Sequence, residues 1–210
     1  MADDDVDDEY DYEFAARHED DSFFRDALRA DVDRCEQLFA AAPKDAFVRR
    51  TLVRTIFAQI EGLAASAIEW ARYYADDTSA LKDNYALAER LVLSGRVAAL
   101  DDKGVAQIAP DRNRARTTAR LRFVLSLVGR GAEQLPDVDC SGPGWAALLD
   151  GLRVRDRLMH PKVAADVDVT DIDLQRARDG RAWFVATYEA RDSALQATIA
   201  KRIFQKIAAL

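Results

Sequence analysis

The sequence predicts an all-α fold: a bundle of amphipathic helices that carries one small β-hairpin as an insertion. Only five prolines and nine glycines occur in 210 residues, which argues against a many-turned β fold. Hydrophobic residues make up 49% of the chain, enough for a sizeable core. Several long segments repeat apolar residues at steps of three and four, the spacing of one helix face. We therefore expect one helical domain, with or without tails.

The first 21 residues are strongly acidic and form a segment of their own. They contain eleven aspartates and glutamates against Arg17 alone, a net charge of −10, whereas residues 22–210 carry +3. Such a segment buries too little apolar surface to order itself. We therefore expect a disordered acidic tail over residues 1–21 and a folded domain over residues 22–210. Three aromatic residues among the acids leave a docking role open: Tyr10, Tyr12 and Phe14.

Three helices are expected in the first half of the domain. The first is predicted over about residues 22–42, since Pro43 stops it, and the second over about 45–75. The second helix has apolar or small residues on two opposite sides, which is typical of a helix at the centre of a bundle. Glu61 lies in the middle of one of these sides. A shorter third helix is predicted over about 81–93.

The second half begins with a predicted β-hairpin insertion at about residues 96–109. Two short apolar runs flank the turn sequence Asp-Asp-Lys-Gly there. A fourth helix is predicted over about 112–128, and it ends at glycines. The long C-terminal helix begins after a capping signal, Thr170 with Asp173 three residues later. Its apolar residues stay in phase past Gly180, so we expect it to be continuous.

A fifth helix, between the fourth and the C-terminal one, carries charges on its apolar face. Its stripe consists of residues at helical spacing: Trp145, Leu148, Leu149, Leu152 and, continuing it, Met159. Arg155 and Asp156 follow three and four positions after Leu152, so both are expected to face inward. Arg153 and Arg157 are expected to point away. Because an ion pair on an apolar face is costly without partners, this pair indicates a site.

The end of this helix is predicted from a proline. Pro161 disfavours the helical conformation at the residue before it, so the helix is expected to end near Met159. His160 then lies at the helix C-terminus. An arginine, a carboxylate and an imidazole therefore converge on one helix end.

The segment Arg155-Asp156-x-x-x-His160 resembles the R-[N/D/H]-x-x-x-H signature of HEPN domains, which lies late in an all-helical fold. The order of elements is also similar to HEPN-related proteins of uncharacterised bacterial or phage type, over about residues 22–210. The resemblance implies a HEPN-like bundle that forms a homodimer and cleaves RNA endonucleolytically, without a metal ion or other cofactor. It implies Arg155 and His160 as catalytic residues in a cleft between two protomers. A toxin-like or anti-phage role, with an antitoxin protein as partner, follows by analogy.

The chemistry of these residue types fits RNA cleavage. RNA is cleaved when its 2′-hydroxyl attacks the adjacent phosphorus. A histidine can accept or deliver the proton, while a guanidinium stabilises charge on the phosphoryl oxygens. Asp156 would orient His160 or Arg155, or neutralise Arg155. Glu61 would pair with Arg155 across the bundle, which is similar to the acidic or polar residue that HEPN proteins use beside their motif.

Other interpretations stay open. From the residues alone, Arg155 and Asp156 form a buried ion network, His160 caps carbonyls at the helix end, and Glu61 pairs with Arg54. A non-catalytic HEPN-like module would bind a nucleotide or RNA, or act as a scaffold. A helical interaction protein would use its acidic tail as the working part.

The most basic stretch runs from Arg112 to Arg130 and contains no acid. Arg112, Arg116 and Arg120 share one helical stripe, which predicts a track for the RNA backbone, although a solvated helix face is an alternative. Lys162, just after the motif, is also expected to bind RNA. The tethered acidic tail is expected to be drawn to this basic helix and to compete with RNA there. Its alternative role is solubility.

The cysteines, the histidines and the lengths of the apolar runs restrict the possible metal sites and membrane-spanning segments. Cys35 and Cys140 are isolated in the sequence, and His18 and His160 are the only histidines, so a His-rich metal site is excluded. No apolar run approaches the length of a membrane-spanning helix, and no signal-peptide pattern opens the chain. We expect a soluble, cytoplasmic protein with both thiols reduced.

Overall fold

A computed structural model describes residues 5–75, 82–94, 99–107, 116–130, 132 and 135–208. Its α-helices are α1 (Asp5–Ala41), α2 (Ala46–Tyr74), α3 (Leu87–Leu93), α4 (Thr117–Val128), α5 (Pro143–Met159) and α6 (Asp171–Ala208). Shorter elements are the 3-10 turns η1 (Lys82–Asn84) and η2 (Ala164–Val167) and the strands β1 (Ala99–Leu100) and β2 (Ala106–Gln107). The predicted all-α fold is confirmed.

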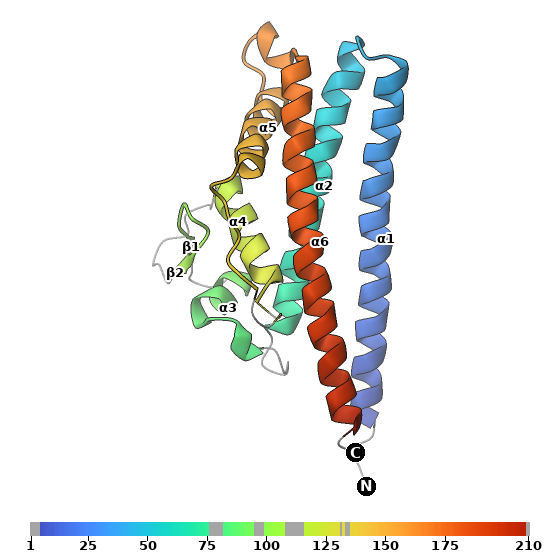
Figure 1. The fold of residues 1–210 in the computed structure, drawn as a ribbon, viewed down its shortest axis with the longest axis vertical. Coiled ribbons are helices and arrows are strands. Elements are labelled where there is room, and N and C mark those ends of the chain that lie inside the picture. Colours follow the sequence, from blue (N-terminus) through green and yellow to red (C-terminus); the bar gives the residue numbers. More distant parts are fainter. Residues whose placement is uncertain are drawn as a thin grey trace.

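Helices α1 and α6 run the length of the molecule, α2 runs beside them for most of it, and α4 and α5 follow one another along the other flank (Figure 1). Helix α5 packs chiefly on α6, and α1 on α2, while α2 contacts α1, α4, α5 and α6. The expected central position of α2 is confirmed by burial on both of its sides. Leu52, Ile56 and Ile60 are fully buried, and so is Phe57, which lies about 100° round the helix from Ile56.

Helix ends follow local chemistry. The N-cap Asp45 accepts hydrogen bonds from Phe47 N–H (2.7 Å) and Val48 N–H (3.1 Å), so α2 begins as predicted. At the start of α6, Thr170 N–H donates to Asp173 Oδ2 (2.9 Å), and Asp173 N–H donates to Thr170 Oγ1 (3.2 Å). This reciprocal pair is a capping box. Helix α6 then continues without a break past Gly180, as expected.

The hairpin is present but short within the described residues. Ala99 pairs with Gln107 and Leu100 with Ala106 in an antiparallel ladder, and the ends of the predicted range 96–109 lie outside the described residues. Gly104 has φ +79° in the turn. A Cβ there would lie 2.6 Å from Ala119 O, so only glycine lets the turn pack this closely on α4.

The prediction of a disordered tail over residues 1–21 is wrong for residues 5–21, which continue α1. The extension is stabilised because its side chains find partners on α2. Asp21 accepts a hydrogen bond from Ser66 and pairs with Arg25 (2.6 Å). Arg17 lies over the ring of Tyr73, 5.7 Å from its centroid. Residues 1–4, and the side chains of the three tail aromatics, lie outside the described residues.

The position of α1 also corrects the expected docking of the acidic segment. Helices α2 and α6 lie between α1 and α4 (Figure 1). Residues 5–21 therefore do not cover the basic helix in this arrangement. Contacts of Asp21 with Ser66 and of Arg17 with Tyr73 hold this position, whereas attraction between exposed charges is screened by salt.

Candidate active site at the end of helix α5

Helix α5 ends at Met159, as Pro161 predicts, and His160 is its C-cap with φ −132° and ψ 57°. The backbone N–H of His160 donates to Asp156 O (3.0 Å) and closes the last turn. His160 thus follows Asp156 by one turn on the same side of the helix. Its side chain is exposed and has no hydrogen bond or ion pair to any residue that the structure describes. The imidazole is therefore open to solvent and uncommitted.

The buried face of α5 is rotated from the predicted one. Its buried residues are Trp145, Leu148, Gly151, Leu152, Val154 and Leu158. Met159 is 49% exposed, so the expectation that it continues the stripe is wrong; Leu158 lies in the core instead. The inward position of Asp156 is also wrong, because its side chain is 60% exposed. The reason is tertiary: α5 packs chiefly on α6, with Leu148 against Gly180, and Leu158 joins the same buried core.

Arg155 is the half-buried charge of the motif, with a side chain 22% exposed. Its Nη2 lies 2.6 Å from Glu61 Oε1 on α2, and its Nη1 lies 3.0 Å from Asp156 Oδ1. The expected pairing of Glu61 with Arg155 is thus present. The alternative pairing of Glu61 with Arg54 is not: Arg54 Nη2 donates to Leu158 O (2.9 Å). Arg54, rather than His160, caps a carbonyl of the last turn.

Arg157 was expected to point away from the bundle, and this is wrong. Its guanidinium donates to the carbonyls of Asp166 (2.9 Å) and Asp168 and pairs with Asp173 Oδ2 (2.7 Å). The segment that follows His160 folds back over the side chain of Arg157. It supplies hydrogen-bond partners that helix periodicity does not predict. Arg157 thereby ties the connection after the motif to the first turn of α6.

The pKa of Asp173 reflects this junction. Burial opposes its ionisation, but hydrogen bonds from Thr170 and the charge of Arg157 outweigh burial and hold the pKa below its ordinary value. A folded pKa below the unfolded one stabilises the fold above the unfolded value, about 3.9, and this stabilisation is lost as pH falls through the folded value.

Asp173→Asn is therefore expected to lower Tm at pH 7 by a few degrees, with the gap to the wild type closing as the pH falls below about 4. Thermal unfolding followed by circular dichroism between pH 7 and pH 2 measures this gap. Asp179→Asn, at an exposed carboxyl of the same helix, is the matched control and should follow the wild type. A gap that stays constant across the pH range would contradict the assignment.

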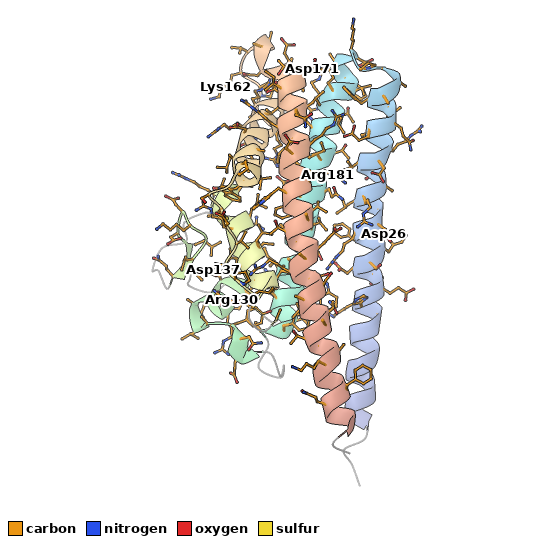
Figure 2. The ribbon with its side chains drawn as sticks, viewed as in Figure 1. Asp26, Arg130, Asp137, Lys162, Asp171 and Arg181 are labelled. Carbon is orange, nitrogen blue, oxygen red and sulfur yellow. The ribbon has the colours of Figure 1, made fainter. Side chains whose placement is uncertain are left out.

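Three of the four residues predicted to bind RNA are described, and Lys162 lies apart from Arg116 and Arg120. Lys162 is exposed at the end of the molecule occupied by Asp171, far from Arg130 (Figure 2). Arg116 and Arg120 are both exposed on α4, one turn apart. Arg116 pairs with Asp102 of the hairpin turn at 3.6 Å. Arg112 lies outside the described residues.

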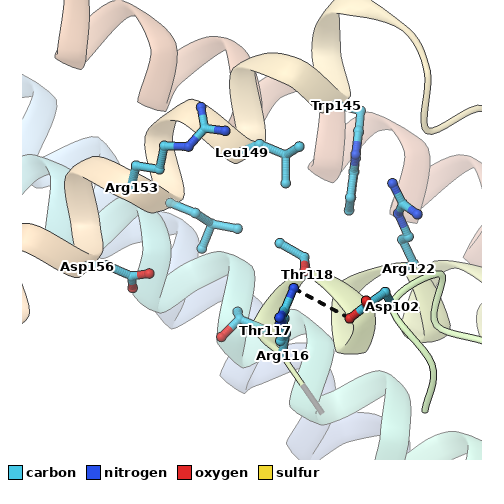
Figure 3. A pocket seen from close by; sticks show the side chains of 10 residues that line it. Asp102, Arg116, Thr117, Thr118, Arg122, Trp145, Leu149, Arg153 and Asp156 are labelled. Carbon is cyan, nitrogen blue, oxygen red and sulfur yellow. Dashed lines mark ion pairs between the residues drawn. The ribbon is translucent and has the colours of Figure 1, made fainter.

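A cleft of about 550 Å³ opens between the first turn of α4, the hairpin turn and α5 (Figure 3). Its lining residues are Asp102, Arg116, Thr117, Thr118, Arg122, Trp145, Leu149, Leu152, Arg153 and Asp156. Of these, only Arg116 and Asp156 are predicted site residues. Arg122 belongs to the recognised basic stretch, but its neighbour Trp145 is far away in the sequence, so only the fold brings the two together.

No family model, no curated protein and no solved structure matches the chain. Across the described ranges, no helix is both long and apolar enough to cross a membrane. Those same residues include no group of three or more His, Cys, Asp or Glu side chains placed to hold a metal ion.

Proposed function

We propose that this protein is a metal-independent endoribonuclease of HEPN type. The observation that carries the proposal is an exposed, uncommitted imidazole at the same helix end as a guanidinium held by two carboxylates. His160 supplies the titratable group, and Arg155 supplies a fixed positive charge. A toxin-like or anti-phage role, with an antitoxin protein as partner, belongs to the same proposal by analogy alone.

The proposed reaction needs only groups of the protein and the RNA. The 2′-oxygen forms a bond to the adjacent phosphorus, the bond from phosphorus to the 5′-oxygen breaks, and the products end in a 2′,3′-cyclic phosphate and a 5′-hydroxyl. His160 takes the proton of the 2′-hydroxyl or delivers one to the leaving oxygen. Arg155 stabilises the negative charge on the non-bridging oxygens, and Glu61 and Asp156 orient its guanidinium.

A single histidine performs one of the two proton transfers, so a second copy of the motif completes the site in a homodimer. Two apolar side chains beside the motif support this assembly, since Met159 is 49% and Val163 is 62% exposed. We expect a dimer by light scattering at micromolar concentration, with the two His160 residues near the symmetry axis. Met159→Glu is expected to shift the population toward monomer, and a wild-type monomer at that concentration would contradict the proposed assembly.

The direct test is incubation of the purified protein with total RNA in the presence of EDTA. We expect cleavage, with 2′,3′-cyclic phosphate at the new ends because the neighbouring hydroxyl is the nucleophile. A 3′ end that carries a cyclic phosphate cannot be ligated to an adapter. The same end can be ligated once the cyclic phosphate has been removed, and this difference identifies it. Absence of cleavage, or cleavage that stops when metal is removed, would exclude the proposed mechanism.

One observation favours a second function, a non-catalytic nucleotide- or RNA-binding or scaffold module. Arg155 is already neutralised by Glu61 and Asp156, so an incoming phosphate competes with two carboxylates for it. In that case, RNA binds without being cleaved, and Arg155→Met mainly changes the stability of the fold.

A further inference from the structure

Arg122 is an arginine without a carboxylate partner at the cleft. It is half-buried on α4, its guanidinium lies 4.8 Å from the centroid of the Trp145 ring, and its buried Nε has no hydrogen-bond acceptor. Within the described residues, no acid forms an ion pair with it. The other two arginines of the cleft have such pairs: Arg116 with Asp102, and Arg153 with Asp150. Holding a partly desolvated guanidinium unpaired is costly, which indicates an anionic ligand.

The surroundings of Arg122 suit a phosphate group. Thr117 and Thr118 form the first turn of α4, and the N-cap Arg116 makes no side-chain capping hydrogen bond there. The first N–H groups of a helix attract phosphate oxygens. The pair between Arg116 and Asp102 is long and highly exposed, so it opposes a ligand only weakly. Figure 3 shows it as the one ion pair drawn among the lining residues.

The cleft is extended rather than compact. Along α5 it is lined from Trp145 to Asp156, which is about 16 Å of helix. Leu149 and Leu152 provide an apolar wall, and Arg153 stands at the rim with its side chain 76% exposed. Cationic groups spread over such a length match successive phosphates of a polymer better than the single phosphate group of a mononucleotide.

The cleft also points to the motif. Asp156 lines its end, and His160 follows one turn later on the same side of α5. Arg153 and His160 are separated by seven residues, about 10 Å along the helix axis. A strand held in the cleft therefore continues toward the imidazole.

We infer that the cleft between α4, α5 and the hairpin turn binds the phosphate backbone of single-stranded RNA, with Arg122 and Arg153 as phosphate ligands. The identity of the ligand as RNA rests on the proposed function. Placing the contacts at Arg122 and Arg153, rather than at the exposed Arg120 outside the cleft, does not depend on cleavage. The turn of the hairpin insertion forms one wall of this RNA-binding cleft, which gives the insertion a role in binding.

The test measures binding of a fluorescein-labelled 12-nucleotide RNA by anisotropy in EDTA, with every 2′-hydroxyl methylated so that the nucleophile is blocked. Arg122→Ala is expected to weaken binding about tenfold or more, as the loss of a charged hydrogen bond does. It should also reduce the slope of log Kd against log salt by about 0.7, the loss of one phosphate contact on a single strand. Arg120→Ala removes the same charge from α4 outside the cleft and serves as the matched control, with little effect expected.

Several outcomes would overturn the inference. These are unchanged binding by a folded Arg122→Ala variant, an equal loss in Arg120→Ala, or adenosine monophosphate that binds as tightly as the 12-nucleotide RNA. If Arg122→Ala does not fold, Arg153→Ala replaces it in the same assay, because removing its exposed side chain should not disturb the fold. A slope of log Kd against log salt that is unchanged in Arg153→Ala would contradict the proposed site. Arg122-dependent binding by a protein that never cleaves RNA would remove the proposed reaction and leave this subsite standing.

Discussion

His160→Ala is expected to lower EDTA-resistant RNA cleavage by about 100-fold or more, the usual size of a general acid–base contribution. The ring is exposed and makes no hydrogen bond to a described residue, so its removal should leave helicity and Tm unchanged. Initial rates on a labelled RNA, with circular dichroism of the same samples, measure both quantities. His18→Ala is the matched control, because it removes the only other histidine of the chain. Cleavage that survives in His160→Ala would exclude the imidazole from the reaction.

Substitutions of Arg155 and of Glu61 are expected to reduce the cleavage rate by different amounts in the same assay. Arg155→Ala removes the group proposed to contact the phosphate and is expected to abolish cleavage. Glu61→Gln removes the negative charge of a positioning partner 2.6 Å away and is expected to give a smaller loss. If Glu61→Gln were as severe as Arg155→Ala, Glu61 would have to act on the RNA itself.

Gly180→Ala is expected to destabilise the fold by about 1–3 kcal/mol, a fall of roughly 3–10 °C in Tm, because the helices are packed too closely to admit a methyl group. A Cβ at Gly180 would lie 2.6 Å from Leu148 Cα and 2.8 Å from Leu148 N. These are backbone atoms of α5, so α5 itself must move. At an exposed helix position, the same change would stabilise by about 1 kcal/mol.

Gly62→Ala is the matched control, since Gly62 also lies inside a long helix. A Cβ there meets the side-chain ends of Leu28 (2.5 Å) and Phe24 (3.2 Å), which can rotate away. We expect its Tm to stay within a few degrees of the wild type in thermal unfolding. Equal stability of Gly180→Ala and the wild type would contradict the close α5–α6 contact, and with it the position of the motif helix.

Local chemistry made the helices predictable from the sequence. Pro161 ends α5 at Met159, Thr170 and Asp173 begin α6, and Asp45 begins α2, each through atoms within a few residues of the boundary. The order of the helices follows from periodicity, and the place of the hairpin from two short apolar runs that flank the turn Asp-Asp-Lys-Gly. The motif residues could be found in the same way, because Arg155 and His160 stand at one helix end whatever surrounds it.

Side-chain direction was less predictable, because it depends on neighbours that are distant in the sequence. Packing of α5 on α6 turns Leu158 inward and leaves Asp156 exposed. The return of the chain after His160 gives Arg157 hydrogen-bond and ion-pair partners and leaves it half-buried, although periodicity places that residue on an outer face. The acidic N-terminal segment is helical from Asp5 because α2 offers partners to residues such as Arg17 and Asp21, which composition cannot reveal.

The sequence by itself determined the all-α class, where α2 and α6 begin, where α5 ends, and that an arginine and a histidine share that end of α5. Only the tertiary structure decided that Glu61 lies 2.6 Å from Arg155 and that Arg122 lies over Trp145 in a cleft that Asp156 also lines. The physical reason is range: capping and periodicity act over a few residues of one helix. Ion pairs and clefts between helices instead depend on the rotation of each helix about its axis, which is set by how all of their apolar faces pack at once.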